Sequence, residues 1–365
     1  MSDDGRRDDD RLRVAYTVEQ CWHDVPGGTA VAALRIAREL RATGAVDLDY
    51  VAGRHPLPPG PDHRPDDSVH MLPLGGAPLY EAWTRVRWPK VESVTGPIDL
   101  AHATGLIPCA TSAPLVVTIH DVAFLHAPRQ FTRHGARLMN RALRAAIKRA
   151  DRIITSSAAS LDDLRDAGVA DDRLRLVPLG VDVLPATADE RSAARATVGA
   201  DGPFVLFVGT VEPRKNLVRL VEALDASGIG VPLVVAGAAG WGDVTVPAEA
   251  PVTFLGHVDD AVLRGLYSEA TVFAYPSERE GFGLPVAEAM AQGTPVVTSA
   301  GTSTEEVAGG AAVLVDPFDV ASIAYGLRTA LDAADEFGRR GRRRADALTW
   351  ADAAAATLDV YRELV

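Results

Sequence analysis

Residues 272–292 read VFAYPSEREGFGLPVAEAMAQ and combine a strand pattern, a glycine-containing loop and a helix pattern. The four apolar residues at 272–275 have the length of a buried strand, and a polar loop with two glycines follows them. A helical pattern then occupies 285–292, with Pro285 in the first turn, where proline has no N–H hydrogen bond to lose. A buried strand followed by a helix is the unit of a parallel sheet covered by helices. The stretch therefore predicts an α/β protein.

The same unit repeats along the whole chain in two sets. In the first half, strands are predicted at 12–18, 46–52, 98–103, 115–120, 152–155 and 174–179, with helices at 29–41, 133–150 and 158–167. In the second half, strands are predicted at 204–208, 232–236, 252–255, 272–275, 295–298 and 312–315, with helices at 216–226, 260–269, 285–292 and 320–333. Ligands of such doubly wound sheets bind at the carboxyl ends of the strands. We therefore expect two Rossmann-like domains that face a common cleft.

The domain boundaries follow from composition. An N-terminal domain is predicted at 11–183 and a C-terminal domain at 199–348, joined by a Pro-, Ala- and Asp-rich linker at 183–199. A final amphipathic helix is predicted within 349–365, and packing back onto the first domain is one position open to it. Residues 1–10 are polar and predict a disordered tail rather than a signal peptide.

Bulk properties narrow the class of function. The net charge of −12 over 365 residues disfavours nucleic-acid binding, which needs a basic surface. Cys21 and Cys109 form neither a disulfide framework nor a metal cluster, as expected of a reduced cytoplasmic protein. No apolar run approaches the roughly 18 residues of a membrane-spanning helix. We therefore expect a cytoplasmic protein whose membrane contact, where it has one, is peripheral.

One basic feature stands apart from this acidic background. Five cations fall at helical spacing, and Leu138, Ala142 and Ala145 supply an opposite apolar face. Two interpretations stay open: a solvated helix face, or a face that docks onto anionic lipid at the inner side of the membrane or onto a phosphate-bearing acceptor. The five cations are Arg133, Arg137, Arg141, Arg144 and Lys148.

Two glutamates flank the start of the helix at 285–292. Glu280 lies in the preceding loop and Glu288 lies within the helix. Their carboxylates accept hydrogen bonds from a polyol at two separate points, and the N–H groups of a helix start suit anionic oxygens. A capped helix with two surface glutamates is the structural alternative.

A pair of cations forms the second candidate cluster. Arg214 and Lys215 belong to the string VGTVEPRKNL at 208–217, which runs from a strand into a helix. Cations at a helix start oppose the helix dipole and indicate a bound anion, and this pair suits a diphosphate. A solvated Arg-Lys pair is the alternative. Asp47 and Asp49 have the bare spacing of metal ligands but lie inside a predicted strand, so we expect no metal and no cofactor.

Two further features lie in the N-terminal domain. Gly27 and Gly28 allow close backbone approach by a ligand, although a glycine pair is also typical of a plain turn. His120 ends a buried strand at the expected cleft, where a structural histidine is the alternative to a ligand-facing one. Asp121 is expected to orient His120 or to cap the turn.

Glu280 and Glu288, with Gly-Phe-Gly-Leu-Pro between them, resemble the glutamate-pair motif of family 4 retaining glycosyltransferases, which have the two-domain GT-B fold. The resemblance extends from Arg11 to the final helix. The strings GTVEPRKNL and VTIHD, together with Gly240-Trp241, resemble the mannosyltransferase-B-like subgroup, which is associated with bacterial polysaccharide assembly.

The resemblance implies a role for each candidate residue. Glu280 is expected to contact donor-sugar hydroxyls near the reacting carbon, and Glu288 to bind the nucleotide ribose. Arg214 and Lys215 are expected to neutralise the leaving diphosphate without a metal, and His120 to lie beside the donor sugar. Further donor contacts are expected at Gly27, Gly28, Val258, Gly281, Phe282, Gly283 and Leu284.

The implied activity is the retaining, metal-independent transfer of a hexose from a nucleotide-diphosphate sugar to a saccharide or lipid-linked acceptor. GDP-mannose is the leading donor. Two alternatives remain: a nucleotide-sugar 2-epimerase, which shares the two-domain architecture, and a non-catalytic nucleotide-sugar-binding protein. An epimerase releases a new free sugar without an acceptor, so the need for an acceptor separates it from a transferase.

Overall fold

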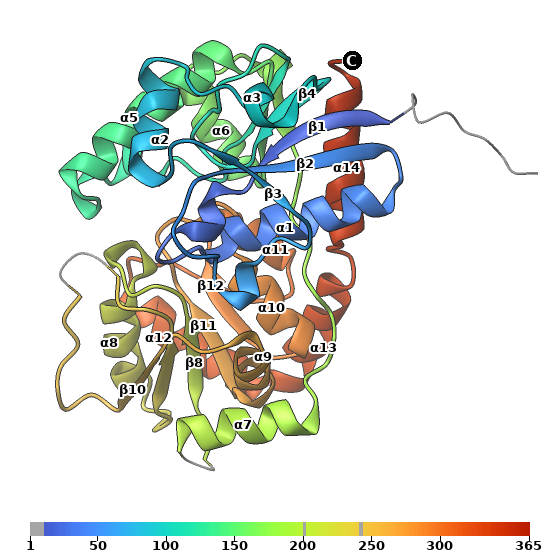
Figure 1. Ribbon diagram of the computed structural model, residues 1–365. Helices are drawn as coiled ribbons and strands as arrows, with labels where there is room; N and C mark the ends of the chain where they lie inside the picture. The colour runs from blue at the N-terminus through green and yellow to red at the C-terminus, as the bar shows by residue number, and fades with distance from the viewer. Residues whose placement is uncertain (1–10, 200–201, 241–243) are drawn as a thin grey trace, which may run out of the picture.

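The computed structural model describes residues 11–199, 202–240 and 244–365. Over these residues the chain forms two parallel sheets surrounded by helices, one domain above the other in Figure 1. The prediction of two Rossmann-like domains is therefore confirmed. The predicted tail at 1–10 and Trp241 of the Gly-Trp pair lie outside the described residues.

The first sheet has the order β3-β2-β1-β4-β5-β6-β7 over the described residues, and its pairings are parallel. Alternate residues of β1 enter different cores, with Val14 and Tyr16 on one face and Ala15 on the other. Because both faces are covered, its central strands are nearly continuous apolar runs. The strands are β1 Leu12–Thr17, β2 Val46–Gly53, β3 Val69–Leu72, β4 Leu100–Ala103, β5 Leu115–Thr118, β6 Arg152–Thr155 and β7 Leu174–Leu176.

The second sheet has the order β10-β9-β8-β11-β12-β13 over the described residues, again with parallel pairings. Its direction of winding reverses between β8 and β11, as that of the first sheet does between β1 and β4. Ligands of open α/β sheets bind beyond the carboxyl ends of the strands at such points. The strands are β8 Val205–Val208, β9 Leu233–Ala236, β10 Val252–Gly256, β11 Val272–Tyr275, β12 Val296–Ser299 and β13 Val313–Val315.

The helices largely follow the predicted positions. The helices of the first domain are α1 Gly27–Ala42, α2 Gly76–Arg85, α3 Glu92–Thr95, α4 Ala123–His126, α5 Arg133–Arg149 and α6 Ala158–Asp166. The helices of the second domain are α7 Ala188–Val198, α8 Leu217–Ser227, α9 Asp260–Glu269, α10 Leu284–Gln292, α11 Ser303–Ala308, α12 Val320–Asp332 and α13 Ala334–Ala345, and α14 Trp350–Arg362 ends the chain. None of the helices in the described part of the chain has both the length and the apolarity to cross a bilayer.

The structure differs from the sequence analysis in the stretch predicted as a linker at 183–199. Helix α7 occupies most of it, begun by a capping box in which Thr187 and Glu190 exchange side-chain and backbone hydrogen bonds of 3.2 and 2.8 Å. Helix α7 packs on α9, where a Cβ at Gly265 would lie 2.1 Å from the Glu190 carbonyl oxygen. The interpretation of this stretch as a linker overlooked a helix that tertiary packing stabilises.

Helix α14 crosses back and packs on α1 of the first domain (Figure 1). The Tyr361 hydroxyl lies 2.7 Å from Nδ1 of His102, whose Nε2 lies 2.7 Å from the Thr118 hydroxyl. The two segments that connect the domains lie side by side, because the N–H of Val181 donates to the Leu348 carbonyl at 3.0 Å. The last helix of the chain is therefore packed as part of the first domain.

The contact between Tyr361 and His102 yields a test of the fold. Burial lowers the pKa of His102 to about 3, so its ring is neutral and needs one donor and one acceptor as partners. Tyr361→Phe leaves one ring nitrogen unpaired and is expected to cost about 1–3 kcal/mol. Thermal unfolding should show a fall in Tm of several degrees. Tyr325→Phe, at a side chain that is 65% exposed, is the matched control, and equal Tm values for both variants would contradict the assignment.

Candidate active site at the domain interface

The loop after β11 enters the space between the carboxyl ends of the strands of the two sheets. A Cβ at Gly281 would lie only 2.6 Å from the carbonyl oxygen of His120, which follows β5. The hydroxyl of Ser156, which follows β6, donates to the Gly281 carbonyl at 3.2 Å. Since any side chain at position 281 would collide with the first domain, glycine permits this close approach of the two domains.

Glu280 lies in this loop with its carboxylate between two cations. The ammonium of Lys215 donates to Oε1 at 2.7 Å, and the guanidinium of Arg214 donates to Oε2 at 3.0 Å. Arg214 also donates to the Arg279 carbonyl at 3.0 Å. The structure thus brings together three of the predicted site residues, and each carboxylate oxygen has its own cation.

Electrostatics keep Glu280 ionised. The side chain is only 8% exposed, and burial alone would raise the pKa of its carboxyl. The positive charges of Arg214 and Lys215 outweigh burial and lower the pKa to about 2. Burial also lowers the pKa of the Lys215 ammonium, against the opposing effect of Glu280. We take the pair as ionised, because the short contact and the second cation both favour the carboxylate.

The sequence pattern placed Arg214 and Lys215 at the start of a helix. This prediction was wrong. They end the 3₁₀ turn η6 Pro213–Lys215, and Asn216 separates this turn from α8. Asn216 has a left-handed backbone with φ of 64°, and its amide donates to the carbonyls of Pro276 and Pro317 at 2.9 and 2.6 Å. These hydrogen bonds fix the turn against the loop after β11, which explains how both cations reach Glu280.

Two residues of this cluster were not singled out from sequence. Glu212 is 2% exposed, and its Oε1 lies 2.7 Å from Nη2 of Arg214, whereas Glu280 contacts Nη1. The hydroxyl of Tyr275 accepts from the Lys215 ammonium, which lies 4.9 Å from the centroid of the Tyr275 ring. Position offered a clue to both, since Tyr275 ends the strand before the motif and Glu212 stands two residues before Arg214.

Two helix starts from different domains meet beside this cluster. Helix α1 begins at Gly27, and a Cβ at Gly28 would lie 3.2 Å from Cδ1 of Leu284, the first residue of α10. Gly283 precedes α10 with φ of 102°, and a Cβ there would lie 2.7 Å from Cγ2 of Thr304. The first N–H groups of a helix have no intrahelical partner and carry partial positive charge. The predicted glycine positions therefore line a place suited to an anion, and the neighbouring side chain of Phe282 is buried.

His120 lies next to the loop that carries Glu280. Its carbonyl accepts from the Ser160 hydroxyl at 2.7 Å, and its ring forms no hydrogen bond with any residue in the described ranges. Burial lowers the pKa of His120, partly offset by Asp121, so the ring is neutral near pH 7. Asp121 caps the turn through Ala123 N–H at 2.9 Å, and its charge also helps to raise the pKa of Arg214.

Glu288 and Val258 were also predicted to belong to the site, and the structure places them near α9. Glu288 accepts from the Tyr267 hydroxyl at 2.7 Å, and burial raises the pKa of Glu288 to about 7. Asp260, two residues after Val258, lies close enough to raise that pKa further. Val258 is partly buried between β10 and α9. The roles implied for Glu288 and Val258 in nucleotide binding remain predictions.

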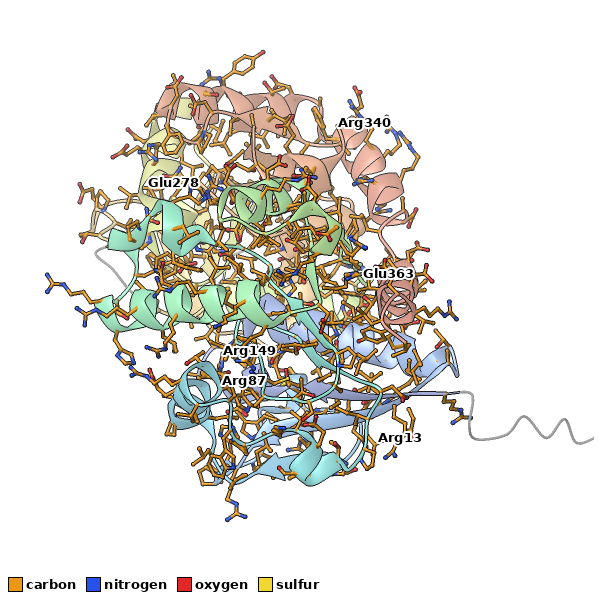
Figure 2. The ribbon with its side chains drawn as sticks, turned by 90° about the horizontal axis from the view of Figure 1, so that it is seen from above. Arg13, Arg87, Arg149, Glu278, Arg340 and Glu363 are labelled. Carbon is orange, nitrogen blue, oxygen red and sulfur yellow. The ribbon has the colours of Figure 1, made fainter. Side chains whose placement is uncertain are left out.

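Polar contacts across the interface hold the two domains together. The carboxylate of Glu306, on α11, accepts from the N–H groups of Ala158 and Ala159 at the start of α6, at 2.7 and 2.8 Å. The Gln130 amide donates to Glu278, labelled in Figure 2, at 3.3 Å. These polar contacts accompany a cluster of buried apolar residues that extends through both domains.

Comparison with known proteins identifies the family. Residues 26–183 match the model described as Glycosyltransferase Family 4, and residues 189–345 match that of Glycosyl transferases group 1. O-antigen chain mannosyltransferase B of Escherichia coli is 32% identical over 68% of this chain and 70% of its own length. D-inositol 3-phosphate glycosyltransferase of Xylanimonas cellulosilytica is 32% identical over 92% of both chains. The chain belongs to family 4 of the glycosyltransferases.

Solved structures agree on the fold. Alr3699/HepE of Anabaena, in a complex with UDP and glucose, superimposes with a TM-score of 0.73 at 18% identity, over 97% of this chain and 100% of that one. At this level of identity the likeness establishes the two-domain GT-B architecture. The protein is therefore a glycosyltransferase with the GT-B fold.

The raised pKa of Glu288 predicts a pH dependence. The folded protein retains a proton on Glu288 between its ordinary pKa of 4.5 and about 7, whereas the unfolded chain has released it. Its contribution to stability is therefore present at low pH and is lost as pH rises through this window. Relative to wild type, Glu288→Gln should become more stable by roughly 2–3 kcal/mol between pH 5 and 8, as measured by denaturant unfolding. Glu222→Gln, exposed on α8, is the control, and parallel profiles for wild type and Glu288→Gln would contradict the prediction.

Proposed function

We propose that the protein transfers a hexose from a nucleotide-diphosphate sugar to a saccharide or lipid-linked acceptor, with retention of configuration and without a metal. Mannose from GDP-mannose is the first donor to test, because a mannosyltransferase is among its relatives. The observation that carries this proposal is the contact of Arg214 and Lys215 with the two oxygens of Glu280, beside the starts of α1 and α10.

The two cations provide the electrostatic part of the reaction. A departing diphosphate gains negative charge as the bond to the sugar breaks, and charges already fixed in place stabilise it without reorganisation. Arg214 and Lys215 are held by Glu212, Glu280 and Tyr275, so they are fixed before the substrate arrives. The N–H groups at the start of α10 add partial positive charge from the other side.

Glu280 and His120 supply the surroundings of the reacting sugar. Glu280 remains an anion at all physiological pH values because its pKa is about 2, so it accepts hydrogen bonds from sugar hydroxyls and stabilises positive charge at the anomeric carbon. His120 is neutral, and its ring is free of partners among the described residues, so it is placed to bond a hydroxyl rather than to act as a cation. Closure of the domains excludes water and aligns the acceptor.

The substitution Glu280→Gln tests this assignment. The amide keeps the size of the side chain but removes the charge that faces the sugar, so kcat should fall by about 100-fold or more while donor affinity changes far less. The donor is first identified by thermal shift with a panel of nucleotide-diphosphate sugars, since a ligand that binds the native state raises Tm. Glu222→Gln serves as the control, and an unchanged kcat in Glu280→Gln would remove Glu280 from the chemistry.

The same assay separates the alternatives. Turnover should persist in EDTA, because Arg214 and Lys215 replace a divalent ion. A requirement for added magnesium would contradict this role. Release of a new free sugar without an acceptor would favour the 2-epimerase, and donor binding without transfer to any acceptor would favour a non-catalytic binding protein.

We also propose that α5 contacts an anionic membrane from the cytoplasmic side. Arg133, Arg137, Arg144 and Lys148 are exposed on this helix, on the outer side of the first domain in Figure 1. Arg141 departs from the predicted set, because Glu81 and the Thr84 hydroxyl bind its guanidinium. The buried apolar positions are Ala142, Leu143 and Ala146 rather than the predicted Leu138, Ala142 and Ala145.

Vesicle sedimentation tests this contact. Each cation near an anionic surface contributes about 1 kcal/mol, so replacing Arg137, Arg144 and Lys148 by alanine should weaken binding to phosphatidylserine-containing vesicles by roughly 100-fold. The control replaces Arg339 and Arg343, which are exposed on α13 of the other domain. Equal binding by wild type and the triple variant would exclude the α5 contact.

A further inference from the structure

A polar cavity of about 340 Å³ lies at the end of the first domain opposite the candidate active site. Leu115, the first residue of β5, lines it, whereas His120 follows the carboxyl end of the same strand. The cavity is bounded by the chain after α2, the loop before β5 and the end of α5. Its lining residues are Arg87, Lys90, Thr111, Ser112, Ala113, Leu115 and Arg149.

Three cations line this cavity, and no carboxylate does. Arg87, Lys90 and Arg149 form no ion pair with any residue in the part of the chain that the structure describes. Burial lowers the pKa of the Arg149 guanidinium, and the neighbouring charge of Arg87 lowers it further. Figure 2 shows the two arginines next to each other. In a protein with a net charge of −12, this is a local excess of positive charge without a counterion.

Arg149 is fixed in position by the backbone. Its guanidinium donates to the carbonyl of Trp83 at 2.9 Å and to that of Cys109. A structural role in tying the end of α5 to α2 explains Arg149 but not the other two cations. Arg87 and Lys90 are exposed. Lys90 donates to the hydroxyl of Ser112, which is also exposed, so this hydrogen bond does not hold a buried part of the fold together.

The nearby acid, Glu92, bonds neutral groups of the cavity wall and forms no ion pair with the three cations among the described residues. Glu92, on α3, accepts through Oε1 from the Thr111 hydroxyl and the Ser112 N–H at 2.8 and 2.5 Å. Arg87 has a left-handed backbone with φ of 56°, which a residue with a Cβ adopts only when its surroundings impose it. The other such non-glycine residue in the described ranges is Asn216, next to Lys215 in the candidate active site.

We propose that this cavity is a second anion site, which binds a phosphate group separately from the donor diphosphate. Arginine presents planar pairs of N–H groups to phosphate oxygens and lysine a point charge, and Ser112 adds a hydroxyl. The volume lies at the lower end of the roughly 300–1,000 Å³ of small-molecule sites, so a phosphate fits together with part of the group that carries it. The phosphate belongs either to a phosphorylated solute or to a lipid headgroup. A lipid is one of the two sources because Trp88 and Val86, which flank Arg87, expose apolar side chains to the extent of 53% and 68%.

The double variant Arg87→Ala/Lys90→Ala tests the site in the full chain. Equilibrium dialysis with radiolabelled inorganic phosphate should show that the variant loses one site, or binds it on the order of tenfold more weakly. Phosphate bound at Arg214 and Lys215 is common to both proteins, so the difference isolates the new site. Arg85→Ala, an exposed neighbour paired with Glu81, is the control. Equal phosphate binding by wild type and the double variant would overturn the proposal.

A second arm identifies the source of the phosphate. Wild type and the double variant share the cations of α5, so a selective loss of sedimentation with phosphatidic acid vesicles in the double variant identifies a lipid headgroup. Weakened phosphate binding with unchanged sedimentation identifies a phosphorylated solute instead. Donor binding and turnover with a soluble acceptor should be unchanged in the double variant, so failure of this site is distinct from failure of the proposed transferase activity.

Discussion

The contact of Glu280 with Arg214 and Lys215 is the constraint on which the interface depends. Three buried charges are costly to desolvate, and they are stable together because each carboxylate oxygen meets a cation and Arg214 has a second acid in Glu212. The cluster ties the turn after β8 to the loop after β11. That loop then places Gly281 against the His120 carbonyl, so an interaction inside one domain sets the distance to the other.

Backbone and polar groups make the contacts next to this cluster of charges, while buried apolar residues pack continuously through both domains elsewhere. Glycines at 28 and 281 bring the domains within contact distance, and Glu306 accepts the N–H groups at the start of α6. Contacts of this kind break at low cost because water replaces them. If the domains separate in the proposed reaction, these contacts would re-form when the domains close.

Most of the fold was predictable because its strands are buried on both faces and read as short apolar runs. β3 escaped prediction because it lies at the sheet edge, where only Leu72 is buried, and α7 escaped because it buries little apolar surface, with Ala194 as its buried residue. Local sequence indicated which charged residues are candidates. The contact of Arg214 and Lys215 with Glu280, however, depends on the hydrogen bonds of Asn216 to carbonyls far along the chain. Tyr275 and Glu212 were missed for the same reason, since a partner far along the chain leaves no periodic pattern. The roles of the site residues came from the family resemblance and stay predictions.

The two segments that connect the domains lie side by side, and this arrangement constrains how the domains can move. Val181 and Leu348 share a hydrogen bond, and a Cβ at Gly180 would lie 2.2 Å from the N atom of Trp350, so the two connections are joined as one unit. A single flexible connection would let the domains tumble independently, whereas two joined connections act as a pivot with a defined axis. If the domains open, this joined pair of connections would confine the motion to one arc and restore the same mutual alignment of the two halves on closing.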